Sequence, residues 1–93
     1  MQFVNPSAGN YECWFSSYVK SSNSSGAISV AIYYSTTQVA ASVREVAQTK
    51  TVPISSHAKV TVNGTQNISV YWSYAGNGTG TCYERTSTIA KVG

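Results

Sequence analysis

The feature that most constrains the fold is an alternation of apolar and polar side chains along most of the chain. In Gly9–Lys20, Cys13 and Phe15 share one face, and Trp14 and Tyr18 share the opposite face. Successive side chains of a β-strand point to opposite sides of a sheet, so this period of two is typical of a strand. The pattern predicts a chain built of strands and turns.

The same alternation continues beyond the first segment, with polar turns between the segments. It predicts strands at Gly9–Lys20, Ala27–Tyr34, Val39–Val46, Ile54–Val62, Gln66–Tyr74 and Thr81–Val92. Residues of Val39–Val46 also favour a helix, but the segment is short and its neighbours are strands. Asn63–Gly64 is the strongest hairpin signal in the chain. We expect one all-β domain over residues 1–93, a two-sheet sandwich or barrel.

Charge is scarce in this chain. Charged residues make up 10% of the 93 residues and no Asp is present, against about 25% in an average soluble domain. A surface rich in Ser, Thr, Asn and Gly tolerates close packing against other copies. The net charge of +3 comes from scattered basic residues, whereas nucleic-acid binding needs a clustered basic stripe. The composition therefore favours a β-rich assembly and argues against a nucleic-acid partner.

Sequence signals for catalysis, metals and membranes are weak. His57 follows Ser55 and Ser56, but adjacent strand residues face apart and no third group completes a triad. Two cysteines do not make a zinc site, and no metal or cofactor is expected. No run of 18 apolar residues is present, and Met1–Pro6 lacks the basic and apolar regions of a signal peptide. We therefore expect a protein that is not an enzyme and does not insert into a membrane.

Two further features leave alternatives open. Cys13 and Cys82 either form a disulfide between neighbouring strands or remain two buried free thiols. The doublets Arg44–Glu45 and Glu84–Arg85 are conspicuous because charge is so rare. Their members either pair between strands, as Arg44 with Glu84 or Glu45 with Arg85, or protect strand edges against aggregation.

Four segments carry a resemblance to a known family. Phe3–Phe15 resembles the signature F-x-x-P-x-x-G-x-Y-x-F of the complement globular-head and tumour necrosis factor (TNF) superfamily, with Cys13 where Phe is common. Ile28–Ala40 is similar to a hairpin of that family, and Val60–Trp72 to its L-x-x-G-D-x-V-x-V segment, with Thr65 in place of Asp. The ending, Thr81–Gly93, resembles the terminal strand of small jelly-roll domains that close bacteriophage tail and fibre proteins.

The resemblance implies a fold and an assembly. Members of this family form two-sheet jelly rolls that usually trimerise around a threefold axis. The family topology would place the strand of Cys13 beside that of Cys82, which raises the disulfide hypothesis. It would also let neighbouring protomers cover the outward side chains of the first strand and the last. The expected trimer-interface residues are Trp14, Ser16, Tyr18, Tyr83 and Arg85, unless the register is inverted and Trp14 belongs to the core.

The expected function follows from this resemblance. The chain would be the head domain of a bacteriophage tail fibre or spike, located in the virion, that trimerises and attaches to a host-surface glycan or outer-membrane protein. Exposed aromatics and turn asparagines are the candidate receptor contacts: Tyr33, Tyr71, Asn23 and Asn77. The alternatives are a structural capsid decoration or collar protein that binds other virion proteins, and a secreted adhesion or lectin-like module.

Overall fold

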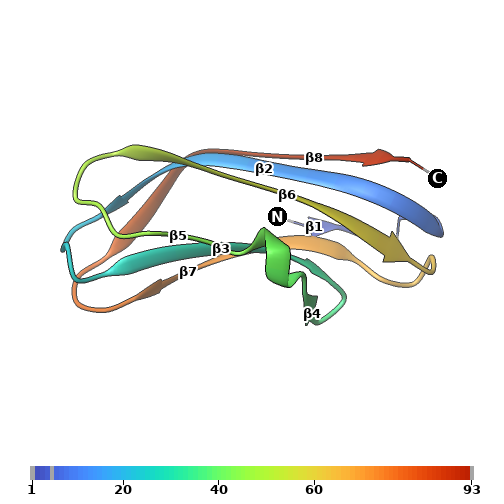
Figure 1. The fold of residues 1–93 in the computed structure, drawn as a ribbon, viewed down its shortest axis with the longest axis horizontal. Helices are drawn as coiled ribbons and strands as arrows, with labels where there is room; N and C mark the ends of the chain where they lie inside the picture. Colours follow the sequence, from blue (N-terminus) through green and yellow to red (C-terminus); the bar gives the residue numbers. More distant parts are fainter. Residues whose placement is uncertain (1, 5, 93) are drawn as a thin grey trace.

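The computed structural model describes residues 2–4 and 6–92 and shows two antiparallel β-sheets packed face to face (Figure 1). Met1, Asn5 and Gly93, which belong to the predicted domain, lie outside the described residues. The elements are β1 (Gln2–Phe3), β2 (Gly9–Ser21), β3 (Ala27–Tyr34), β4 (Thr37–Gln38), the 3-10 helix η1 (Ala40–Ser42), β5 (Arg44–Val46), β6 (Val52–Val62), β7 (Ile68–Ala75) and β8 (Gly80–Lys91). The predicted all-β, two-sheet sandwich is confirmed.

The two sheets differ in size and in their central strands. Sheet A has the order β1-β7-β3, with β4 and β5 both pairing with the far side of β3. Sheet B has the order β6-β2-β8, so β2 is its central strand. In Figure 1 the strands of sheet B form the upper layer and those of sheet A the lower one. The 13-residue β2 is paired along nearly its whole length on both sides.

The core lies between the sheets and follows the predicted alternation. Every second residue of β2 and β6 is buried, and the intervening residues are exposed or partly exposed. Sheet A contributes the fully buried Ile28, Ile32 and Ile68. Burial of such side chains is the main stabilising contribution, about 1.5–3 kcal/mol each. The core cluster comprises Tyr11, Cys13, Phe15, Val19, Ile28, Val30, Ile32, Ile54, Ala58, Val60, Val62, Ile68 and Val70.

The turn at Asn63–Gly64 does not form the predicted hairpin. It joins β6 in sheet B to β7 in sheet A, so the strands on either side of it do not pair with each other. The Asn63 side chain accepts a hydrogen bond from the Thr65 N–H at 2.9 Å, and Gly64 has a φ of 93°. The Asn-Gly pair therefore provides a tight turn, but the chain uses it to cross between layers.

The predicted strand at Val39–Val46 is also wrong. The structure places η1 in its middle and leaves only the three-residue β5 at its end. The cause is the buried Ser42 hydroxyl, which donates a hydrogen bond to the Val39 carbonyl at 2.6 Å and accepts one from the Ile32 N–H at 2.8 Å. Ser and Thr hydroxyls that bond the local backbone in this way compete with regular strand pairing.

The last strand, β8, lies at the free edge of sheet B and contains a β-bulge. The register against β2 shifts by one residue between Ser16 and Tyr18, and Glu84 in the bulge has a φ of 49°. The Ser17 hydroxyl donates a hydrogen bond to the Tyr83 carbonyl at 2.7 Å beside the bulge. A bulge places two residues of one strand opposite one residue of its partner. Side chains beyond the bulge therefore lie on the opposite face from the one they would occupy in an uninterrupted strand.

Coverage of the core is incomplete on the β8 side. The inward residues of β8, Cys82 and Ile89, are only partly buried. Trp72 of β7 lies opposite Val30 and so faces inward, yet it is 38% exposed. Tyr74, predicted with Trp72 on the core face, does pack against the core. The sandwich is therefore closed on the β6 side and open on the β8 side.

Candidate functional site

The outer face of sheet B carries four of the predicted interface residues, and we name it the Trp14 face: Trp14, Ser16, Tyr18 and Tyr83, together with His57. Trp14 is 40% exposed, and its ring stacks on that of His57 with centroids 5.0 Å apart and an interplanar angle of 20°. The stacking follows from register, because these two residues lie directly opposite each other on β2 and β6. Trp14 therefore lies outside the core, as the alternation predicts.

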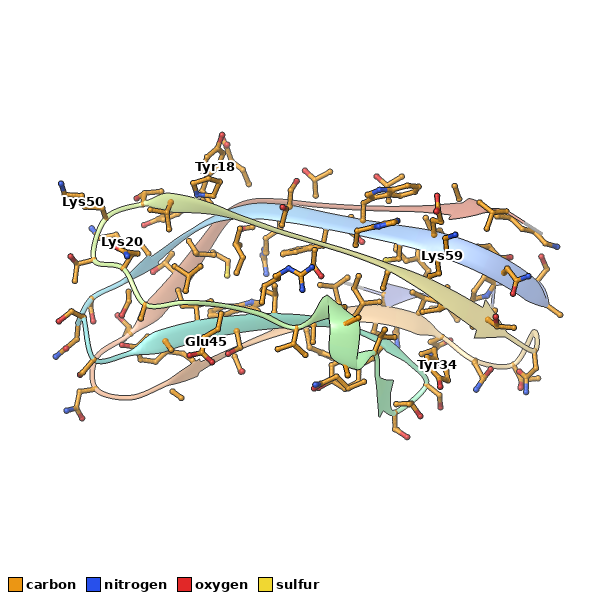
Figure 2. The ribbon with its side chains drawn as sticks, in the orientation of Figure 1. Tyr18, Lys20, Tyr34, Glu45, Lys50 and Lys59 are labelled. Carbon is orange, nitrogen blue, oxygen red and sulfur yellow. The ribbon has the colours of Figure 1, made fainter. Side chains whose placement is uncertain are left out.

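Tyr18 and Tyr83 extend this face toward the bulge. They lie directly opposite each other on β2 and β8 and are 47% and 44% exposed. Figure 2 shows Tyr18 pointing away from the sandwich above sheet B. Cross-strand aromatic pairs stabilise a sheet modestly, but they leave a large apolar area in water. The structure thus brings Trp14, Ser16, Tyr18 and Tyr83 together on one face.

Arg85, the fifth predicted interface residue, lies in the bulge of β8. The register places it, with Glu84, between Tyr83 and Thr86, where the two residues face Ser17 of β2. Its guanidinium charge acts on the thiol of Cys82 on the same strand. Arg85 therefore lies outside the regular strand register that brings the other four residues together.

A shallow hollow of about 440 Å³ lies at the Trp14 face. Its lining combines aromatic rings, hydroxyls and one guanidinium: Trp14, Phe15, Ser16, Arg44, Ser55, Ser56, His57, Thr86 and Thr88. Glu12 lies beside it, 3.8 Å from the imidazole of His57 and 3.9 Å from the ammonium of Lys59. The contact of His57 with Trp14 could not be predicted from the sequence, because it depends on the register between β2 and β6.

Two of the candidate receptor contacts, Tyr33 and Tyr71, meet on the outer face of sheet A, and we name them the tyrosine pair. Their rings form an edge-to-face contact with centroids 5.1 Å apart at 81°. The Tyr33 hydroxyl donates a hydrogen bond to the side-chain carbonyl of Gln38 at 2.7 Å. Tyr71 is 54% exposed, and a hollow of about 130 Å³ lies beside the pair. The pair is therefore a fixed but accessible aromatic platform.

The other two candidates, Asn23 and Asn77, lie in neighbouring turns at one end of the sandwich. The turns are joined by hydrogen bonds from the Ser22 N–H to the Thr79 carbonyl at 2.8 Å and from the Thr79 N–H to the Ser22 hydroxyl at 2.7 Å. The Asn23 side chain accepts hydrogen bonds from Ser25. Four residues of β7 separate this end from Tyr71, about 13 Å of strand. These asparagines and the tyrosine pair therefore form two separate sites.

The predicted disulfide between Cys13 and Cys82 is not formed. Their strands are neighbours, as the family topology implied, but Cys13 lies opposite Ile89 and Cys82 lies opposite Val19. Six residues of β2 separate Cys13 from Val19, about 20 Å, whereas a disulfide needs Cα atoms within about 7 Å. Both cysteines are free thiols. Burial raises the pKa of Cys13 to about 11.

The thiol of Cys82 has a more mixed environment. Burial raises its pKa, while the charge of Arg85 and a hydrogen bond with Ser17 act in the opposite direction. Among the described residues, no group of three His, Cys, Asp or Glu side chains is close enough to hold a metal ion. Within the same residues, no helix is long and apolar enough to cross a membrane.

The two serines next to His57 lie on opposite sides of β6. Ser56 is buried and its hydroxyl donates to the Ser42 carbonyl, on the opposite side of β6 from His57. Ser55 is on the same side as His57. The imidazole of His57 lies 3.8 Å from the Glu12 carboxylate and stacks on Trp14.

Comparison with known proteins gives no relative for this chain. No protein-family model matches the sequence, and no curated protein or solved structure matches it.

Proposed function

We propose that this chain is a non-enzymatic head domain of a bacteriophage tail fibre or spike. It assembles as a TNF-like jelly-roll homotrimer through the Trp14 face and contacts a host-surface receptor through the tyrosine pair. One observation carries the proposal: each sheet has an ordered group of exposed aromatic rings on its outer face, in a chain with 10% charged residues. The two-sheet sandwich and the pairing of β2 with β8 support the proposal.

The Trp14 face has the properties of a protein–protein contact. Trp14, Tyr18 and Tyr83 are each at least 40% exposed. Aromatic residues are enriched in interface centres, where a few such side chains contribute most of the binding energy. The hydroxyls of Ser16, Thr86 and Thr88 around them add uncharged polar groups. Packing against identical copies would remove the rings from water.

The trimer is tested by light scattering on the wild type and the Trp14→Ser variant. We expect a wild-type mass equal to a multiple of three chains, and a smaller species for Trp14→Ser. Tyr71→Ser is the matched control, because it removes an even more exposed ring from sheet A and should leave the mass unchanged. A wild-type monomer, or equal effects of the two variants, would contradict the trimer face.

The tyrosine pair suits a glycan or protein receptor. Tyrosine offers an apolar ring face and a hydroxyl, which together match the mixed surface of a sugar ring or a protein loop. The contact between Tyr33 and Tyr71 fixes the rings before binding, so little conformational entropy is lost. Three such sites on one rigid head would act together, and multivalency can raise avidity by factors of about 10²–10⁴.

Receptor binding is tested on a glycan array and on isolated host outer-membrane proteins. We expect a signal from the wild type that Tyr71→Ser abolishes. Trp14→Ser should bind the same ligand more weakly, because the sites are no longer linked. A stable trimer that binds neither class of receptor would instead support a structural decoration or collar protein.

A further inference from the structure

The edge of β8 is a long unpaired strand edge. β8 spans 12 residues, and β2 is its only strand partner among residues 2–4 and 6–92, so the backbone N–H and C=O groups that point away from β2 have no strand partner there. Such an edge is a template for another strand unless it is short, charged or distorted. Most of β8 is uncharged: its charged residues are Glu84 and Arg85 at its centre and Lys91 at its end. The charges of Glu84 and Arg85 therefore decide which strand can pair with the free edge of β8.

The bulge makes a symmetric pairing of β8 possible. Tyr83 and Thr86 lie opposite Tyr18 and Ser16, which both face outward. Cys82 and Ser87 lie opposite Val19 and Phe15, which both face the core. In an antiparallel pair, opposed residues must share a face. Because the bulge adds one residue, Tyr83 of one copy can lie opposite Thr86 of the other, with both side chains on the outer face. In the same register Cys82 lies opposite Ser87, with both side chains on the core face.

We propose that β8 pairs antiparallel with the β8 of a second copy of this chain, around a twofold axis at the bulge. Tyr83 then lies opposite Thr86 of the second copy, and Glu84 lies opposite Arg85. The twofold axis places two such Glu84–Arg85 pairs at the contact, one on each side of the axis. The three-stranded sheets of the two copies join into one continuous sheet, with the order β6-β2-β8 followed by its inverse. The contact uses the backbone edge of β8, next to the Trp14 face, and goes beyond the proposed trimer.

Charge complementarity at the axis supports a second copy as the occupant. Both ion pairs among the described side chains involve Glu12, so Glu84 and Arg85 have no ion-pair partner within the described part of the chain. Within one chain the pairing of Arg44 with Glu84 is not formed, and Arg44 bonds the carbonyls of Ala41 and Val43. In the symmetric pair, each carboxylate faces a guanidinium.

A buried polar atom on the same strand is satisfied by this pairing as well. The Ser87 hydroxyl oxygen is buried without a hydrogen-bond partner. A buried polar group without a partner costs free energy, and such groups are rare in folded proteins. In the symmetric pair Ser87 lies opposite Cys82 of the second copy, whose thiol can donate a weak hydrogen bond.

The test exchanges the charges of Glu84 and Arg85 in a Trp14→Ser variant, in which the Trp14 face no longer contributes to assembly. We expect the parent to form a dimer by light scattering at high protein concentration. Glu84→Arg alone and Arg85→Glu alone place like charges opposite each other, and each should weaken the dimer at least about tenfold. The double variant Glu84→Arg/Arg85→Glu restores opposite charges and should restore the dimer.

The outcomes separate this proposal from edge protection. A monomeric parent, or the same mass for the single and double variants, would overturn it and assign Glu84 and Arg85 to blocking the edge or to pairing with a strand of another protein. Circular dichroism of each variant verifies the sandwich.

A crosslinking experiment tests the register even if a charge variant fails to fold. In a Cys13→Ala chain, Ser87→Cys places a new thiol opposite Cys82 of the second copy, within the range of a disulfide. We expect a covalent dimer on oxidation. Thr88→Cys in the same chain is the control, because it faces outward and should not crosslink to Cys82. Equal crosslinking of the two variants, or none, would overturn the register.

Discussion

The two edges of sheet B show how one sequence pattern gives two different environments. On the β6 edge, η1 and β5 close the sandwich, and the Ser56 hydroxyl bonds the carbonyl of the fully buried Ser42. On the β8 edge no such element is present among the described residues, and the inward Cys82 and Ile89 are only partly buried. The difference shows that alternation fixes the direction of a side chain, while its burial depends on whether another segment covers it.

The largest expected difference between the two edges is in apolar packing. Ile54 of β6 is 5% exposed, whereas Ile89 of β8 is partly buried, and both face inward. Ile54→Ala should lower the free energy of unfolding by about 2–5 kcal/mol, because it leaves a cavity in a closed core. Ile89→Ala should cost less than half as much, since water already reaches the site. Urea unfolding measures both, and equal losses would contradict an open β8 side.

A smaller difference is expected between two buried serines. Ser42→Ala leaves the Ile32 N–H without its acceptor and should lower the free energy of unfolding by about 1–3 kcal/mol. Ser87→Ala removes a hydroxyl that has no partner, so its effect should be near zero or slightly stabilising. These values apply to the monomer and are measured by urea unfolding at low protein concentration. A larger loss for Ser87→Ala than for Ser42→Ala would reverse the comparison.

The smallest expected effect concerns the thiol at the centre of sheet B. Burial raises the pKa of Cys13 from 9.0 to about 11, so the unfolded chain releases this proton first as the pH rises. The stability contributed by the neutral thiol is complete below pH 9 and is lost between pH 9 and 11, by about 1 kcal/mol at pH 10.

The control for this pH effect is a variant without the thiol. Unfolding free energies at pH 8 and pH 10 should differ by about 1 kcal/mol less in Cys13→Ala than in the wild type. Cys82→Ala should change the difference less, because Arg85 and Ser17 partly offset the effect of burial there. The same pH dependence in all three chains would show that Cys13 titrates normally.

Much of the fold could be predicted from local pattern alone. The alternation in Gly9–Lys20 and Ala27–Tyr34 gave the strands and their core faces, because period two is a property of each strand by itself. It failed at Val39–Val46, where the Ser42 hydroxyl replaces strand pairing with a turn of helix. It also failed at Asn63–Gly64, since a turn signal does not specify which sheet the next strand joins.

For the candidate site, the sequence predicts only the face of its own strand on which each residue lies. Exposed positions such as Trp14 and Tyr71 follow from alternation, but the stacking of Trp14 on His57 depends on the register between strands far apart in sequence. The disulfide prediction failed for the same reason, because neighbouring strands do not imply opposed cysteines. The extra residue in β8 that places Arg85 in a bulge has no signature in the alternation either.

The pairing order of sheet B also constrains how the chain can be made. β2 is synthesised before β8, residues 80–91, which is one of its two neighbours in the sheet. β1 likewise pairs with β7, more than 60 residues later in the chain. Folding dominated by such distant contacts is intrinsically slow. One edge of β2 therefore stays unpaired until β8 has been made, and Glu12 and Lys20 are the charges on β2 that oppose aggregation in that interval.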